Sequence, residues 1–189
     1  MSRRRLFLGI RLPDNLKRQL ATYQNKWNSL PAKWVKEKNL HITLLFLGRM
    51  RKDQVKKTVE TVHEVEEKVE PFSVNFEKVT YAPPGKEVPR LIWVQGQKSD
   101  SLTQLREELK KELHEARLYY GSDDHEFIPH ITLARLKKWA WKRMNPMEKP
   151  TVKDNVNFQV DVNNFEVIES KLSSKGPRYI TLEKVNLSS

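Results

Sequence analysis

His41-Ile42-Thr43-Leu44 recurs as His130-Ile131-Thr132-Leu133, so one tetrapeptide stands at similar places in the two halves of a 189-residue chain. Each copy follows a helical pattern and begins an apolar stretch typical of a β-strand. Side chains of a strand alternate between its faces, so the histidine and threonine of each copy share one face while isoleucine and leucine share the other. The repeat therefore predicts two equivalent strands that are anchored in a core and present His and Thr together.

Strand and helix patterns are mixed along the rest of the chain. Periodicity predicts strands over residues 5–12, 40–47, 72–81, 91–94, 131–136, 157–168 and 178–185, and helices over 16–27, 55–69 and 99–118. Gly48 is expected to end the second strand, and residues 137–153 are basic and irregular. This order favours an α+β fold: bilobal, with two pseudo-symmetric antiparallel-leaning sheets, helices outside and a central cleft. No long linker separates the halves, so residues 1–189 are expected to form a single bilobal domain.

Charge and composition limit the possible partners. The chain has 35 Lys and Arg against 24 Asp and Glu, a net charge of +11, and no cysteine. Because basic surface releases counterions from phosphate, a nucleic acid is the natural partner, and a basic protein without such a partner is the alternative. The lack of cysteine excludes disulfides and thiol chemistry and fits a cytoplasmic protein. No apolar run reaches about 18 residues, so no membrane span is expected.

Two histidines and two threonines around one cleft suit phosphodiester chemistry. Near neutral pH, one imidazole can accept a proton from the attacking oxygen while the other donates a proton to the leaving oxygen. Thr43 and Thr132 can hold the non-bridging phosphate oxygens. A metal site is the other option. No Cys, Asp or Glu lies within three residues downstream of His41 or His130, and neither has a second His at i+2 or i+4, so no metal is expected. Residues 123–126 (Asp-Asp-His-Glu) could bind a cation, although a solvated loop is the favoured interpretation.

Aromatic and basic residues provide candidates for contact with the rest of a nucleic-acid substrate. Phe7 lies on a strand face that could border the cleft and could stack on the terminal base; a core phenylalanine is the equal alternative. The basic stretch after Arg135 interleaves cations with tryptophans, which is typical of a track for a single strand. Its alternative is a solvated loop with its tryptophans in the core. The candidates here for binding the nucleic-acid strand are Lys138, Trp141, Lys142 and Arg143.

Several blocks in a fixed order carry a resemblance to a known family. They are residues 5–10 (RLFLGI), 39–48 (NLHITLLFLG), 89–94 (PRLIWV), 127–135 (FIPHITLAR) and 169–172 (ESKL), with Gly176 and Tyr179. In these blocks the chain resembles the two-histidine (2H) phosphoesterases, and within them the RNA 2′,3′-cyclic phosphodiesterases, also called LigT-like or 2′-5′ RNA ligase proteins. The resemblance covers nearly the whole chain.

The resemblance implies a bilobal fold and hydrolysis of an RNA 2′,3′-cyclic phosphate end to a 2′-phosphate. It implies that His41 is the proton donor to the leaving 3′ oxygen and that His130 is the proton acceptor that activates water. Thr43, Thr132 and Arg135 match residues that hold the phosphate. No metal and no nucleotide cofactor are implied. Some relatives also join RNA ends through a 2′-5′ bond, which is the reverse chemistry.

Two positions do not match the family simply. Lys38 stands where an acidic residue is common, and no change of chemistry is expected from it. Strict strand alternation places Arg135 on the face opposite His130, so Arg135 reaches the cleft only if the strand bends or ends there.

Two other functions are compatible with the residues alone. One is a non-enzymatic RNA-binding module, which would not need two titratable rings. The other is a phosphodiesterase of small nucleotides such as 2′-5′ oligoadenylates or a cyclic ADP-ribose phosphate, which would not need the basic stretch. Nothing in the sequence demands an oligomer or an obligate protein partner, so a monomer is expected.

Overall fold

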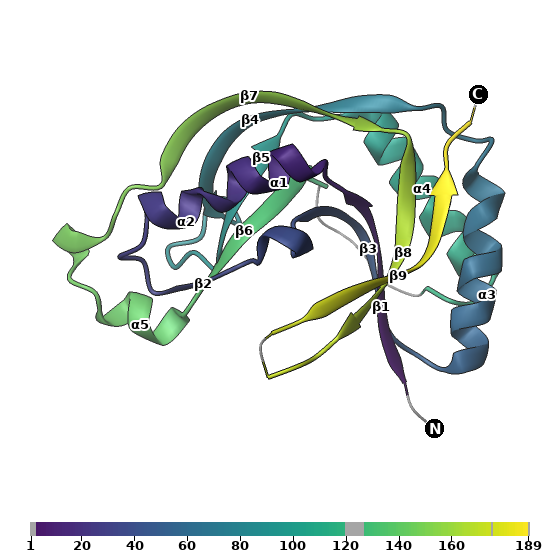
Figure 1. Ribbon diagram of the computed structural model, residues 1–189, viewed down its shortest axis with the longest axis horizontal. Coiled ribbons are helices and arrows are strands. Elements are labelled where there is room, and N and C mark those ends of the chain that lie inside the picture. Colours follow the sequence, from purple (N-terminus) through teal and green to yellow (C-terminus); the bar gives the residue numbers. More distant parts are fainter. Residues whose placement is uncertain (1–2, 120–126, 175, 189) are drawn as a thin grey trace.

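The computed structural model describes residues 3–119, 127–174 and 176–188 and has an α+β architecture built on antiparallel strands (Figure 1). The strand order is β7-β4-β5-β6-β3-β1-β8-β9, and the short β2 pairs with β6. The strands are β1 (Arg4–Arg11), β2 (Ala32–Trp34), β3 (His41–Met50), β4 (Phe72–Ala82), β5 (Leu91–Gly96), β6 (His130–Leu136), β7 (Lys153–Val162), β8 (Asn164–Lys171) and β9 (Arg178–Asn186). The mixed helix and antiparallel-sheet prediction is confirmed.

The two copies of the tetrapeptide lie on the inner edges of two half-sheets. One half is β3-β1-β8-β9 and the other is β6-β5-β4-β7, so each begins with a motif strand. The halves are joined through one residue pair, Ile42 with Ile131. This bridge makes the two expected sheets continuous, and β3 and β6 diverge on either side of it.

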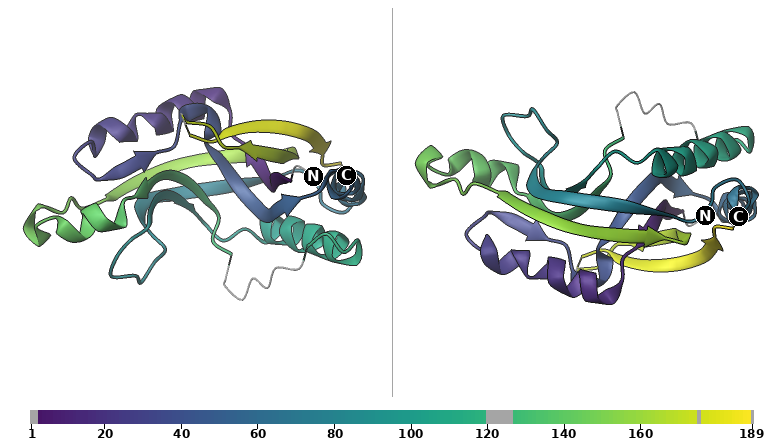
Figure 2. Two further views of the ribbon diagram at one scale, coloured as in Figure 1. Left: turned by 90° about the horizontal axis from the view of Figure 1, so that it is seen from below. Right: turned by 90° about the horizontal axis from the view of Figure 1, so that it is seen from above.

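Helices cover the sheet in separate groups. The α-helices are α1 (Asp14–Ala21), α2 (Tyr23–Lys26), α3 (Lys52–Val62), α4 (Asp100–Glu115) and α5 (Lys138–Arg143), and single 3₁₀ turns are η1 (Glu37–Asn39), η2 (His63–Val65) and η3 (Pro146–Glu148). Helices α3 and α4 pack together at the end of the molecule that carries the two termini, and α5 lies at the opposite end (Figures 1 and 2). In the described part of the chain, no helix is long and apolar enough to cross a membrane.

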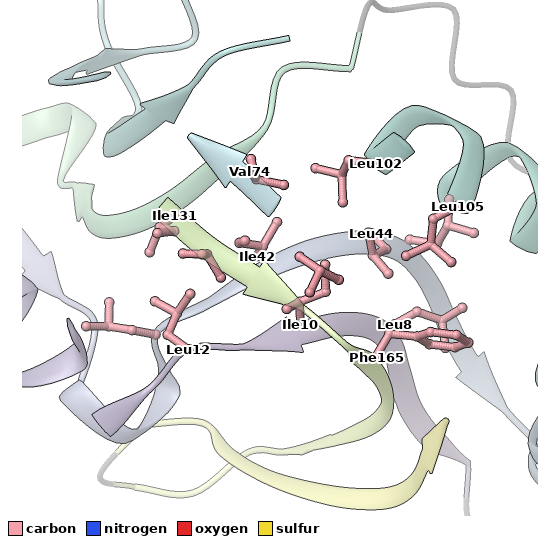
Figure 3. Close-up of a cluster of buried hydrophobic side chains, with 14 of the residues drawn as sticks. Leu8, Ile10, Leu12, Ile42, Leu44, Val74, Leu102, Leu105, Ile131 and Phe165 are labelled. Atoms are coloured by element: carbon pink, nitrogen blue, oxygen red, sulfur yellow. The ribbon is translucent and has the colours of Figure 1, made fainter. Parts of the chain in front are cut away.

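The core forms where the motif strands meet. Ile42 and Ile131 are fully buried, and Leu44 and Leu133 are 3% and 2% exposed, as the alternation predicts. Figure 3 shows Ile42, Leu44 and Ile131 in one cluster with leucines of α4. Burying each such side chain stabilises the fold by about 1.5–3 kcal/mol. The apolar halves of both tetrapeptides thus anchor the faces that carry the histidines.

Both motif strands contain a β-bulge at the fourth residue of the tetrapeptide. Along β1 and β3, Leu8 pairs with Leu45 and Gly9 with Thr43, which leaves Leu44 unpaired. Along β5 and β6, Ile92 pairs with Ala134 and Trp93 with Thr132, which leaves Leu133 unpaired. An extra residue shifts the alternation by one position. The second residue after each bulge, Phe46 on β3 and Arg135 on β6, therefore lies on the histidine face.

Several expected boundaries are wrong for local physical reasons. The strand expected over 157–168 is two strands, because β7 pairs with β4 in one half while β8 pairs with β1 in the other. Gly48 does not end β3: with φ at +75° it sits at a second irregularity, and the strand continues to Met50. The helix expected over 55–69 ends as α-helix at Val62, and the one over 16–27 breaks at Thr22. The basic stretch contains α5, and the three-residue β2 is too short for a periodic signal.

Candidate active site

The cleft at the junction of the halves collects the polar halves of both tetrapeptides. Because Ile42 pairs with Ile131, the residues that flank each isoleucine project from one face: His41 and Thr43 from β3, and His130 and Thr132 from β6. All four side chains line a pocket of about 320 Å³. The pocket is also lined by Lys33, Trp34, Lys36, Asn39, Phe46, Leu91, Arg135, Pro177 and Tyr179.

His41 is held by hydrogen bonds at both ring nitrogens. Its Nδ1 lies 2.6 Å from the backbone oxygen of Asn39 and its Nε2 lies 3.0 Å from the hydroxyl of Thr43. A carbonyl can only accept, so Nδ1 carries a proton and Nε2 is the atom available to the cleft. Burial lowers the pKa of His41 from 6.5 to about 4, and the positive charges of Arg11, His130 and Arg135 act in the same direction.

His130 repeats this arrangement. Its Nδ1 lies 2.8 Å from the backbone oxygen of Ile128, again two residues earlier, so the same nitrogen is protonated. Burial is also the main reason why the pKa of His130 is lowered, with Arg135 contributing. Two rings with the same tautomer therefore direct their Nε2 atoms to one pocket, and both are biased toward the neutral form that can accept a proton.

Aromatic rings pack against each imidazole. The Phe7 ring lies 4.9 Å from His41 and the Tyr179 ring meets His41 edge-on at 5.3 Å. On the other half, the Trp93 ring lies 4.3 Å from His130. Phe7 is 3% exposed, so the stacking role considered for it is corrected: Phe7 is a core residue that supports His41. The exposed aromatic side chain at the pocket is Phe46, which is 68% exposed.

Asn39 joins the His41 strand to the loop between β8 and β9. Its backbone oxygen binds His41, and its side-chain Nδ2 donates to the backbone oxygen of Pro177 at 2.8 Å. Asn39 is only 3% exposed, and Tyr179, two residues after Pro177, touches the other side of the imidazole. One buried amide thus fixes the two segments that hold His41.

Arg11 brings a positive charge to the same end of the pocket. It lies opposite His41 in the β1–β3 register. Its Nε donates to Glu166 at 3.0 Å, and the Thr181 hydroxyl donates to the same carboxylate at 2.6 Å. This network keeps the guanidinium beside His41, where it favours the neutral imidazole.

Arg135 lies in the pocket with His130 and Thr132. The bulge at Leu133 explains how it reaches the cleft against simple alternation. Phe46 occupies the equivalent position on β3, five residues after His41, because of the bulge at Leu44. Phe46 could not be found from the sequence for this reason, since a bulge has no periodic signal of its own.

The basic stretch lies away from this pocket. Lys138, Trp141, Lys142 and Arg143 are on α5 and do not line it. Trp141 is 6% exposed and packs edge-on against Tyr81 at 5.2 Å, so its expected stacking role is corrected to a core role. The exposed tryptophan of α5 is Trp139. The pocket is instead lined by Lys33 and Trp34 of β2 and by Lys36, which follows β2. The sequence analysis did not predict β2 and therefore did not identify these residues.

Metal-ligating side chains do not gather in the described ranges: no group of three or more His, Cys, Asp or Glu is placed to hold an ion. The stretch 123–126, where a cation site was weighed, lies outside the described residues.

Comparison with known proteins identifies the family. Residues 12–173 match the model of the 2′-5′ RNA ligase superfamily. The chain is 30% identical over 158 residues to an RNA 2′,3′-cyclic phosphodiesterase of Aquifex aeolicus, with 82% of each chain covered. It is 30% identical over 185 residues to a protein of the same name from Thermotoga maritima, covering 94% of this chain and 92% of the relative.

Solved structures agree with this match. The crystal structure of a Thermus thermophilus protein superposes with a TM-score of 0.81 at 28% identity and 97% coverage of both chains. Escherichia coli LigT, crystallised with 3′-AMP, shares the fold with a TM-score of 0.78 at 23% identity, over 100% of both chains. The chain belongs to the 2′-5′ RNA ligase superfamily, and the resemblance to two-histidine phosphoesterases is confirmed.

Proposed function

We propose that this chain is an RNA 2′,3′-cyclic phosphodiesterase, which hydrolyses the cyclic phosphate end of an RNA to a 2′-phosphate and a free 3′ hydroxyl. One observation carries the proposal: two imidazoles of the same tautomer present Nε2 to one pocket that also holds two threonine hydroxyls and a guanidinium. The names of the relatives at about 30% identity support the same substrate.

The proposed reaction uses the two rings in opposite roles. The Nε2 of His130 accepts a proton from water as the water oxygen attacks phosphorus. The bond from phosphorus to the 3′ oxygen breaks, and the Nε2–H of His41 donates the proton that this oxygen takes up. Each properly placed acid or base contributes roughly 10²–10⁴-fold. The two histidines have the same tautomer and the same local sequence, so the choice of donor and acceptor follows the family resemblance.

Three side chains are assigned to the phosphate itself. Arg135 can pair with the non-bridging oxygens, and Thr43 and Thr132 can donate hydroxyl hydrogens to the charge that develops there. The Thr43 hydroxyl now bonds His41, so it would turn from the ring to the phosphate. The substrate's negative charge would raise the lowered pKa of His41 and so help it to hold the proton that it must donate.

Ligation is proposed as the same ring opening with an RNA hydroxyl as the nucleophile instead of water. A 5′ hydroxyl of a second RNA would replace water at His130, and a 2′-5′ bond would form as the ring opens. We also infer a monomeric cytoplasmic enzyme whose partner is RNA. The charge of +11 supports the RNA partner and the cysteine-free composition fits the cytoplasm. Light scattering of the purified protein tests the monomeric state.

Product analysis tests the proposed function. The pure protein, with EDTA present, is incubated with a short RNA that ends in a 2′,3′-cyclic phosphate. A 2′-phosphate product is expected, at a rate that EDTA does not change. A 3′-phosphate product would contradict the proposed bond cleavage, and loss of activity in EDTA would contradict the metal-free mechanism. No turnover of the bound RNA would contradict the proposed activity.

A further inference from the structure

A second hollow, of about 500 Å³ and open to solvent, lies at the far end of the half-sheet that carries His41. It forms where the start of β1, the end of β3 and the end of β8 meet. Five cations line it against one carboxylate, Glu169. The lining residues are Arg3, Arg4, Arg5, Arg49, Glu169, Ser170, Lys171 and Leu172.

Only some of these cations have a carboxylate or hydrogen-bond partner in the fold. Glu169 is buried, forms an ion pair with Arg4, and lies 4.0 Å from the Lys171 ammonium. Arg3, Arg5 and Arg49 have no hydrogen bond or ion pair within the described ranges. Arg5 and Arg49 are moreover directly opposite each other on β1 and β3. Like charges at such a position destabilise a strand pair, and a bound anion would remove this repulsion.

Phe46 connects this hollow to the proposed active site. Phe46 borders the pocket of His41 and Thr43, and it pairs with Phe7 across β1 and β3. The next outward-facing pair along the same two strands is Arg5 with Arg49. From Thr43 to Arg49 the path is roughly 20 Å at about 3.3 Å per residue, somewhat less because of the bulges. An exposed aromatic ring followed by unpaired arginines suits successive bases and phosphates of a single strand.

We propose that Phe46 and the arginine hollow bind the RNA chain on the 5′ side of the cyclic phosphate. A base of the strand stacks on Phe46, and an upstream phosphate lies between Arg5 and Arg49. This inference rests on the proposed function, because that function places the RNA end beside His41 and His130. It replaces α5 as the main track, since α5 does not line the pocket and its Trp141 is buried.

Substrate length tests the inference. kcat/KM is measured for an RNA of about ten nucleotides and for a dinucleotide, both with a cyclic phosphate end, at low and moderate salt. In Arg5→Ala/Arg49→Ala, the ratio of long to short kcat/KM is expected to fall about tenfold. The salt slope of KM for the long RNA should fall by about 0.7 for each phosphate that the variant no longer binds. Phe46→Ala should lower kcat/KM for both RNAs without changing the salt slope, because both contain the nucleotide next to the pocket.

Two further variants decide the location. Lys86→Ala/Lys98→Ala removes the same charge from exposed loops elsewhere and should leave the ratio at its wild-type value. Lys142→Ala/Arg143→Ala tests α5. An unchanged ratio in Arg5→Ala/Arg49→Ala, or an equal fall in the α5 variant, overturns the inference. A wild type that turns over neither RNA contradicts the proposed function instead, and the inference falls with it.

Discussion

Each histidine of the site is held by its own backbone rather than by an acidic partner. The carbonyl two residues earlier accepts from Nδ1 in both copies, at 2.6 Å for His41 and 2.8 Å for His130. This hydrogen bond fixes the tautomer; it raises the pKa of each ring, but burial lowers the pKa by more. The residues just before each tetrapeptide therefore fix the tautomer of its histidine, and burial in the fold favours the neutral ring.

Asn39 is the residue on which the position of His41 most depends. In Asn39→Ala, the bond to Pro177 is removed and the β8–β9 loop no longer holds Tyr179 against His41. We expect kcat to fall about tenfold, as for the loss of one buried hydrogen bond, with KM for a dinucleotide substrate within about twofold. Steady-state kinetics measure this, with the exposed Asn75→Ala as the control. A fall in thermal stability with an unchanged kcat would reduce Asn39 to a purely structural role.

At the scale of elements, the paired bulges decide which side chains enter the cleft. The sequence predicts the strands and the buried isoleucines and leucines, because these follow a period of two. It does not predict the β-bulges at Leu44 and Leu133. For this reason the sequence places Arg135 on the wrong face of its strand and does not identify Phe46 as a pocket residue. The sequence also does not predict the turn at Asn163, because no glycine or proline marks the point where β7 ends and β8 crosses to the other half.

Arg135→Met tests the bulge in β6 directly. Arg135 lowers the pKa of both His41 and His130, so its removal is expected to raise both values. Titration of the imidazole resonances by NMR measures this. Arg143→Met, on the exposed face of α5, is the matched control and should leave both values unchanged. If Arg135→Met also left them unchanged, Arg135 would lie on the face opposite the histidines, as simple alternation requires.

At the scale of the whole molecule, one hydrophobic cluster runs through both half-sheets, from Leu6 of β1 to Val162 of β7. We propose that residues 1–189 form a single bilobal domain, because each motif strand buries its apolar face in that shared core. The repeat allowed this symmetry to be predicted from the sequence. The single bridge between the halves, and the position of β2 beside β6, depend on long-range pairing that no local pattern encodes.

Urea unfolding at different pH values tests the shared core and the buried histidines together. We expect one cooperative transition. The folded pKa of His41 is about 4, against 6.5 when it is exposed, so the unfolded chain binds more protons between these values. Stability should therefore be full above about pH 6.5 and decrease as the pH falls toward 4, by about 3 kcal/mol from His41. His41→Ala should weaken this dependence; two separate transitions would contradict the single domain.

The most direct test of the central claim is turnover of a cyclic-phosphate RNA by His41→Ala and His130→Ala. The control is His63→Ala, which removes a partly exposed histidine that bonds Glu66 and lies outside the pocket. Fluorescence anisotropy follows RNA binding in parallel. We predict a loss of at least about 10²-fold in kcat for each pocket variant, retained RNA binding, and normal activity in the control. Turnover within tenfold of wild type in either pocket variant would contradict acid–base catalysis by the two histidines.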